Sequence, residues 1–232
     1  MTVEIVHAKP QAPSKFLVIG EPFSGKTTLA AKSPKPIFIS TDGNAAKAGL
    51  TAINVNTMQD IREALKLAVE AKEYRTIVID TIEGIVDIMT RDVLDEFNRL
   101  GAKQATGQPI QSLSDVPFGK ATGTLNNRIS KFANSLALIN KNVIILSYTK
   151  RQVDEFTNSI VLASELKNIR LITRFMDAQV ITLFDGEKYT ASIINKRDLM
   201  AGEVDYGEIE SFLTVIGWTL PKKSVKVGKA KR

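Results

Sequence analysis

The chain has 232 residues, which is enough for one α/β domain and requires no second one. It contains no cysteine and a single histidine, so the sequence excludes disulfides, zinc fingers and cysteine–histidine nucleophiles. Residues 1–15 lack the apolar run of a signal peptide, and no later segment is apolar for long enough to cross a bilayer. We therefore expect a cytoplasmic protein without a membrane partner.

The formal net charge of +6 arises at the end of the chain. Residues 221–232 contain no acidic residue, and their basic residues are Lys222, Lys223, Lys226, Lys229, Lys231 and Arg232. The rest of the chain is neutral on paper. We predict a basic disordered tail over residues 221–232, which either contacts nucleic-acid phosphates or only aids solubility.

The first predicted elements of the domain enclose a phosphate-binding motif. Residues 1–15 are expected to be an N-terminal extension, and Phe16 to Ile19 form a short apolar strand. The eight residues from Gly20 to Thr27 then match G-x-x-x-x-G-K-[ST] at every fixed position, and a helix is predicted to follow. Such a loop directs backbone N–H groups and a helix N-terminus at phosphates, whereas a chance glycine turn would not bind them.

The motif assigns roles to individual side chains. Lys26 is expected to contact the β- and γ-phosphates of ATP, and the Thr27 hydroxyl is expected to bind Mg²⁺. Together with Asp80, discussed below, the predicted nucleotide-binding residues are Gly20, Glu21, Pro22, Phe23, Ser24, Gly25, Lys26, Thr27 and Thr28.

Alternating strands and helices continue after the loop. The next predicted elements are strands at residues 37–40 and 52–55, a helix at 57–72 that begins at Thr57 and Asp60, and a buried strand at 76–80 followed by a helix. Asp80 ends its strand after four apolar or β-branched residues, so it is expected at the carboxyl edge of the sheet near Thr27. There it would hold Mg²⁺ with Thr27, although a carboxylate that caps the next helix is the alternative.

Two carboxylates are candidates for orienting or deprotonating a water molecule in line with the γ-phosphate. Asp42 lies just beyond the strand at 37–40, and Glu83 lies three residues after Asp80. We favour Asp42 by a small margin, because Glu83 at the start of a helix has an ordinary capping and dipole role available.

The second half of the chain completes the predicted sheet. Residues 101–123 are predicted to form a long loop, and residues 149–168 a polar stretch after a buried strand at 142–147. A helix is predicted at 125–139, and Asp185-Gly186 joins two strand-like runs as in a hairpin. The expected fold is therefore α/β, with a mostly parallel sheet flanked by helices and a C-terminal antiparallel hairpin.

These motifs resemble those of a known protein family. The P-loop, residues 41–43, 78–81 and 118–120 and the strand at 144–147 together resemble phage-encoded RecA-like P-loop ATPases, in particular the short Sak-type proteins implicated in single-strand annealing. The resemblance covers residues 16–220. It implies a RecA-like ATPase domain over these residues.

The resemblance also implies how ATP is used. RecA-like proteins carry a catalytic carboxylate, usually glutamate, at the place of Asp42, and the shorter side chain here favours slower hydrolysis. They also carry a basic element that reaches the γ-phosphate held by a neighbouring subunit. Lys196 and Arg197, which follow the strand-like run at 190–195, are the candidates for that element, but the two bases are adjacent and do not reproduce the family spacing, so a solvated turn is the other interpretation. A homo-oligomer, either a ring or a filament, is therefore expected.

Single-stranded DNA is the expected partner, because RecA-like proteins bind DNA through loops that correspond here to residues 101–123 and 149–168. The candidate contacts are Lys103, Gln104, Gln108, Gln111, Lys120, Lys150, Arg151, Lys167 and Arg170, with Phe118, Tyr148 and Phe156 as stacking candidates. A single-strand binding protein is a second candidate partner. The alternative functions are a small-molecule kinase and an ATP-switched, non-hydrolytic binding module such as a helicase loader.

Overall fold

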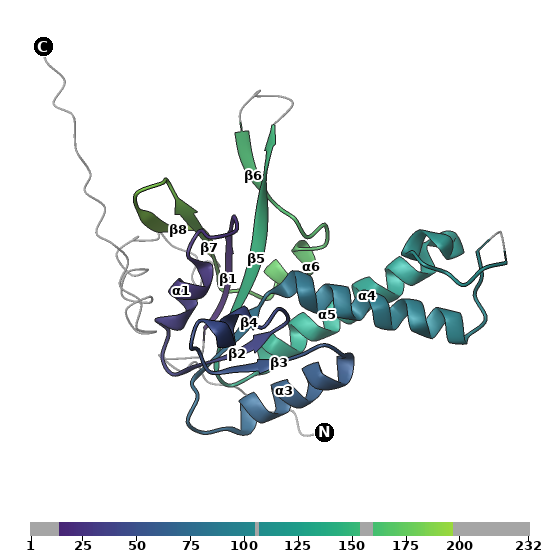
Figure 1. Cartoon of the computed structure of the whole chain (residues 1–232), viewed down its shortest axis with the longest axis horizontal. Coiled ribbons are helices and arrows are strands. Elements are labelled where there is room, and N and C mark those ends of the chain that lie inside the picture. The colour runs from purple at the N-terminus through teal and green to yellow at the C-terminus, as the bar shows by residue number, and fades with distance from the viewer. Residues whose placement is uncertain (1–13, 105–106, 154–159, 197–232) are drawn as a thin grey trace, which may run out of the picture.

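The computed structural model describes residues 14–104, 107–153 and 160–196 of the chain (Figure 1). The predictions for the tail at 221–232, for Arg197 and for Phe156 concern residues outside these ranges, as does most of the extension predicted at 1–15. The helices are α1 (Lys26–Ala31), α2 (Asn44–Lys47), α3 (Met58–Glu70), α4 (Ile82–Arg99), α5 (Lys120–Leu138) and α6 (Arg170–Thr173), with 3₁₀ turns η1 (Leu113–Asp115) and η2 (Pro117–Gly119). The strands are β1 (Lys15–Gly20), β2 (Pro36–Ser40), β3 (Ala52–Asn54), β4 (Thr76–Asp80), β5 (Asn142–Val153), β6 (Ile160–Ser164), β7 (Ala178–Phe184) and β8 (Tyr189–Lys196).

One sheet organises the described residues. Its strand order is β3-β2-β4-β5-β1-β7-β8, and the pairs from β3 to β7 are all parallel. Strand β8 closes the edge as the antiparallel partner of β7, and β6 pairs with β5 alone. The predicted architecture is confirmed: an α/β fold with a mostly parallel sheet flanked by helices and a C-terminal antiparallel hairpin. Strand β5 lies between β1, which precedes the P-loop, and β4, which ends in Asp80.

Helices cover both faces of the sheet. Along β1, Leu17 and Ile19 pack into a large cluster with residues of α3, α4 and α5, whereas Phe16 and Val18 pack into a smaller cluster with residues of α1 and α2. Because successive strand residues face opposite sides, a central strand that is covered twice must be apolar throughout. This is why the predicted strands appear as continuous apolar runs in the sequence.

Two lysines at the amino edge of the sheet, one buried and one half-buried, donate hydrogen bonds to carbonyl oxygens at or just beyond the ends of helices. Lys15 Nζ donates hydrogen bonds to the carbonyl oxygens of Ile139 and Lys141, just beyond α5. Lys141 Nζ does the same for Ala68 and Ala71, at the end of α3. Burial lowers the pKa of Lys15 to about 8. Both lysines satisfy carbonyl groups that helix ends leave without partners.

The start of α3 agrees with the sequence. The Thr57 hydroxyl accepts the Asp60 N–H at 3.1 Å, and the Asp60 carboxylate accepts the Thr57 N–H at 2.9 Å, which is the reciprocal capping arrangement.

The predicted loop at residues 101–123 is too long by four residues. Helix α5 begins at Lys120, after Gly119 with a φ of 64°, and it includes Gly123. Glycine and threonine lower the helix propensity of this first turn, but burial of Ala121 and Leu125 against the core overrides it. The preceding segment is also ordered in part, because Ser112 and Asp115 form a capping box at η1.

The described part of the polar stretch predicted at residues 149–168 is mostly strand. Strand β5 continues to Val153 and pairs with β6, with Lys150 opposite Ala163. We name β5 from Thr149 onward together with β6 the arm, and Figure 1 shows it extending away from the rest of the sheet. The β5 half of the arm is polar from Thr149 to Gln152, which conceals a strand, whereas β6 is an apolar run that the prediction overlooked.

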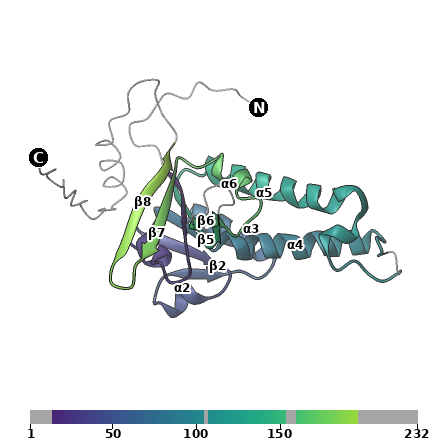
Figure 2. The same ribbon diagram turned by 90° about the horizontal axis from the view of Figure 1, so that it is seen from above.

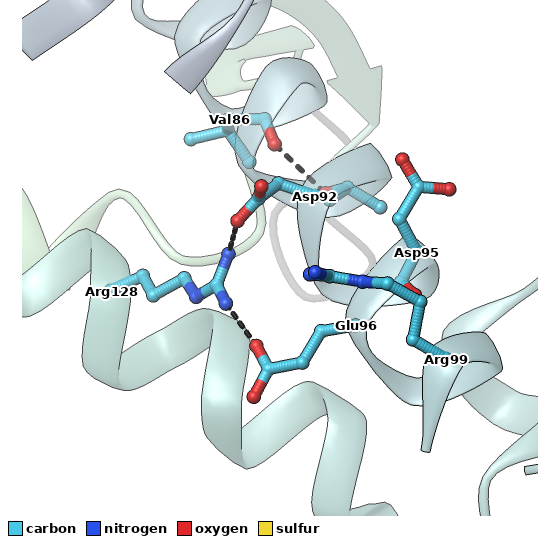
Figure 3. Close-up of polar contacts among 7 residues, drawn as sticks. Val86, Asp92, Asp95, Glu96, Arg99 and Arg128 are labelled. Atoms are coloured by element: carbon cyan, nitrogen blue, oxygen red, sulfur yellow. Dashed lines mark hydrogen bonds and ion pairs between the residues drawn. The ribbon is translucent and has the colours of Figure 1, made fainter. Parts of the chain in front are cut away.

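Helices α4 and α5 form a long antiparallel hairpin that extends to one side of the sheet (Figures 1 and 2). Between the two helices, the Arg128 guanidinium of α5 pairs with the carboxylates of Asp92 and Glu96 on α4 (Figure 3). Asp92 and Glu96 lie four residues apart, so both face α5. One arginine thus fixes the register of the two helices.

We expect Arg128→Ala to lower the free energy of unfolding by about 1 kcal/mol, because the ion pairs are only partly exposed. Chemical denaturation followed by circular dichroism measures this. Arg99→Ala is the matched control, since Arg99 contacts only the Asp95 carbonyl oxygen of its own helix among the described contacts (Figure 3). Equal losses in the two variants would contradict the proposed register role.

Among the described residues, no helix has both the length and the apolar character needed to span a membrane.

Candidate nucleotide-binding site

The P-loop joins β1 to α1. At its two motif glycines, any larger residue would clash with neighbouring atoms or strain the backbone. A Cβ atom on Gly20 would lie 2.3 Å from Ser24 Oγ and 2.4 Å from Thr182 Oγ1. Gly25 has a φ of 89°, in the left-handed region that favours glycine. The hydroxyl oxygens of Ser24 and Thr182 lie 2.8 Å apart, and the hydrogen bond between them connects the loop to β7. The backbone can therefore curl tightly enough to surround phosphates.

Lys26 is buried, and its amino group lies within the curve of the loop. Lys26 Nζ donates to the carbonyl oxygens of Gly20 and Glu21, each at 2.8 Å, and lies 4.3 Å from the centre of the Tyr148 ring. Burial lowers the pKa of Lys26 to about 8, while the carboxylate of Glu83 acts in the opposite direction. The residues present thus fit a triphosphate, whose oxygens would replace neutral carbonyls as partners of a buried cation.

Thr27 and Asp80 meet as predicted. Thr27 Oγ1 donates to Asp80 Oδ2 at 3.1 Å, and Asp80 is only 4% exposed. Burial, followed by the charge of Asp42, raises the pKa of Asp80 to about 6. A buried carboxylate without a strong cationic partner fits a cation, which would remove much of this cost.

Mg²⁺ fits this pair of oxygens. Within the part of the chain that the structure describes, no group of three or more His, Cys, Asp or Glu side chains could hold a metal ion. Mg²⁺ requires no such group, because it is usually held by one or two protein ligands, phosphate oxygens and water. Thr27 and Asp80 are the residues that would hold it.

The two candidate carboxylates have different surroundings. Asp42 is exposed, and its oxygens accept hydrogen bonds from Ser40 Oγ at 3.1 Å and from the backbone and side-chain nitrogens of Asn44 at 2.9 and 2.7 Å. It lines the cavity described below. Its side chain is therefore occupied by local contacts at the start of α2.

Glu83 points from α4 toward β5. Its Oε1 accepts the Ser147 hydroxyl at 2.6 Å and the Tyr148 N–H at 3.0 Å, while Oε2 is buried and has no partner among the described residues. Burial raises the pKa of Glu83. The Thr149 hydroxyl is likewise buried without a described partner. The carboxylate thus makes contacts across to β5 in addition to lying in the first turn of α4.

A cavity of about 780 Å³ lies over the loop. Of the site residues predicted from the sequence, those that line the cavity are Pro22, Phe23, Ser24, Gly25, Lys26, Thr27, Thr28, Asp42 and Asp80. The hairpin residues Thr182, Tyr189, Thr190 and Ala191, and Tyr148 of β5, also line it. Sequence reasoning missed the hairpin residues as site residues, because the pairing of β7 with β1 cannot be read from a local motif. The cavity is large enough for a nucleotide.

The arm is joined to the P-loop by an ion pair. Arg151 donates to both carboxylate oxygens of Glu21, at 2.8 and 3.0 Å. This arginine was predicted to contact DNA, and in the structure its guanidinium is engaged within the chain.

Of the basic pair predicted to act on a neighbouring subunit, only the backbone of Lys196 is described, and it lies away from the P-loop of its own chain. Lys196 ends β8 opposite Ala178, whereas the P-loop begins at the other end of this sheet, where Gly20 is opposite Thr182. Arg197 is not among the described residues.

The predicted DNA contacts form two separate groups. Lys150, Lys167 and Arg170 are exposed on or near the arm. The other group, at the far end of the α4–α5 hairpin, consists of Lys103, Gln104, Gln108, Gln111, Phe118 and Lys120. Figure 1 shows the hairpin and the arm extending in different directions, so the structure does not bring the two groups together. Phe118 is 96% exposed, whereas Tyr148 packs over Lys26 and lines the cavity.

Comparison with family models decides the family. Residues 12–186 match the model of the AAA domain. The chain belongs to the AAA domain family. This match spans the P-loop, Asp80 and Glu83 and reaches the turn of the β7–β8 hairpin.

Two further comparisons add little to the family assignment. No curated protein matches the chain in a sequence search. Among solved structures, the crystal structure of the RadB recombinase is similar to it, with 14% sequence identity, a TM-score of 0.46, and coverage of 80% of this chain and 83% of that chain.

Proposed function

We propose that this AAA-domain protein hydrolyses ATP with Mg²⁺ and uses the nucleotide to control binding to single-stranded DNA. The observation that carries the nucleotide part is the P-loop, in which buried Lys26 and the Thr27–Asp80 pair face one cavity of about 780 Å³. The resemblance to Sak-type proteins adds the setting, which is recombination, annealing or replication of phage DNA in the cytoplasm of the host cell.

The residues of the chain divide the work in this proposal. The backbone N–H groups of the loop and Lys26 bind and orient the triphosphate, and Thr27 and Asp80 hold Mg²⁺. The ion supplies positive charge to the phosphates when it is bound. Lys196 and Arg197 of one copy of the chain reach the γ-phosphate of the nucleotide that a neighbouring copy binds.

We propose that Glu83, rather than Asp42, orients and deprotonates the attacking water. Glu83 has a free buried oxygen and a raised pKa, which make its carboxylate a stronger base than an ordinary one. Asp42 instead accepts three hydrogen bonds near the start of α2, which support a structural role. Ser147 holds the Glu83 carboxylate in place.

The proposed DNA contacts are exposed cations on and beside the arm. Lys150, Lys167 and Arg170 are all exposed. Contacts of this kind favour binding to the phosphate backbone without sequence preference. If the six charges of residues 221–232 take part, log affinity should fall with log salt with a slope of about −4.

Binding to a fluorescent single-stranded oligonucleotide at low salt, with ATP and Mg²⁺, tests this function. We expect ATP to strengthen binding in the wild type, and Lys26→Ala to remove the stimulation. Lys47→Ala is the matched control, since Lys47 is exposed on α2 and does not line the cavity. A wild-type protein that ignores the oligonucleotide under these conditions would refute the DNA part. The particle mass with and without ATP and oligonucleotide tests whether copies assemble.

A further inference from the structure

The β7–β8 hairpin extends beyond the start of the P-loop. Strand β7 runs parallel to β1, and Thr182 lies opposite Gly20, the first residue of the loop. Strand β7 then continues to Phe184, and the chain returns along β8 from Tyr189 (Figure 2). The turn end of the hairpin, at Phe184 and Tyr189, therefore lies beside the P-loop rather than beside another strand.

An aromatic pair occupies this end of the hairpin. Phe184 and Tyr189 are direct cross-strand partners, and their rings stack with centres 4.4 Å apart and planes inclined by 24°. Despite this contact, Phe184 remains 43% exposed and Tyr189 57% exposed. Exposed large apolar side chains that gather at one place mark a binding surface more often than a fold requirement.

Tyr189 is the member of the pair that faces the nucleotide cavity. It lines the cavity, whereas Phe184 does not. A Cβ atom on Gly25 would lie 3.0 Å from Tyr189 Cδ1, so the Tyr189 ring borders the P-loop. Phe184 thus covers one face of the ring, the Cδ1 edge borders the loop, and much of the remaining surface stays open.

The cavity has two chemically different ends. On the side of β4 and β2, Asp80 and Asp42 line it, and this end suits a cation bound to phosphates. On the other side of β1, the lining consists of Tyr189, Thr190 and Ala191 of the hairpin. A triphosphate held by the loop leaves its base to occupy the uncharged end, where an aromatic ring offers a stacking surface.

We propose that Tyr189, supported from behind by Phe184, is the platform on which the base of the bound nucleoside triphosphate stacks. The inference rests on the proposed function, since it requires a triphosphate in the P-loop. It assigns the hairpin a role in binding the base, and it predicts that purine nucleotides bind more tightly than pyrimidine nucleotides because a larger ring stacks more strongly.

The test compares ATP with inorganic tripolyphosphate, which lacks the base, by titration calorimetry with Mg²⁺. Tyr189→Ala should weaken ATP binding about tenfold and leave tripolyphosphate binding unchanged. Tyr189→Phe should retain ATP affinity, since it keeps the ring. Leu183→Ala is the matched control, because Leu183 is an exposed apolar residue of the same hairpin that does not line the cavity. The preference of the wild type for ATP over UTP should disappear in Tyr189→Ala.

The outcomes separate this inference from the proposed function. If the wild type binds ATP and Lys26→Ala abolishes that binding, but Tyr189→Ala binds ATP like the wild type, only the base platform is overturned. Equal losses of ATP and tripolyphosphate affinity in Tyr189→Ala would overturn it as well. A wild-type protein that binds neither ligand would overturn the nucleotide site itself, and the platform with it.

Discussion

Glu83→Gln is expected to slow ATP hydrolysis at least about 100-fold, while ATP affinity stays within about threefold of the wild type. The carboxylate has a buried oxygen with no described partner, and burial raises its pKa, so it is suited to take a proton from water. Glutamine keeps the size of the side chain and can still accept the Ser147 hydroxyl, but it cannot act as a base. Single-turnover hydrolysis and calorimetric ATP binding measure the two quantities separately.

Asp42→Asn is the comparison for this experiment. The Asp42 side chain mainly accepts hydrogen bonds from Ser40 and Asn44, and asparagine keeps part of that capacity. We expect less than a tenfold loss of hydrolysis. The reverse ranking, with a large loss in Asp42→Asn and little in Glu83→Gln, would make Asp42 the catalytic carboxylate. Little hydrolysis by the wild type would favour a protein that uses ATP as a switch.

Lys26→Ala is expected to weaken ATP binding about 100-fold, because it removes the buried cation whose present partners are two loop carbonyl groups. Thermal unfolding reports this through the upward shift of the midpoint that a bound ligand causes. Millimolar ATP with Mg²⁺ should raise the midpoint of the wild type and of Lys47→Ala, and leave that of Lys26→Ala nearly unchanged. An equal shift in Lys26→Ala would place the triphosphate elsewhere on the chain.

The nucleotide site was largely predictable from sequence because its parts are local. The P-loop is a continuous motif, and Asp80 ends a short apolar strand, which places it at the carboxyl edge of a parallel sheet. The Thr57–Asp60 helix start is also a short-range pattern, and the structure has it as predicted. Each of these features depends on fewer than ten consecutive residues.

Features that depend on distant pairing were not predictable in the same way. The arm was predicted as a loop because its β5 half is polar from Thr149 to Gln152, and the apolar run of β6 becomes a strand only through long-range pairing such as that of Lys150 with Ala163. Tyr189 was missed because its place over the loop follows from the parallel register of β7 with β1. The surroundings of Glu83 could not be inferred either, since Ser147 lies 64 residues away in the chain.

The ion pair between Glu21 and Arg151 makes the P-loop and the arm thermodynamically reciprocal. Any ligand of the arm that takes Arg151 away from Glu21 must compensate for both of its hydrogen bonds. If binding of such a ligand changes the affinity for nucleotide by some factor, then binding of nucleotide must change the affinity for that ligand by the same factor. Because the pair is exposed, this coupling should weaken as the salt concentration rises. The salt concentration of an assay would then change the communication between the two sites as well as the strength of each.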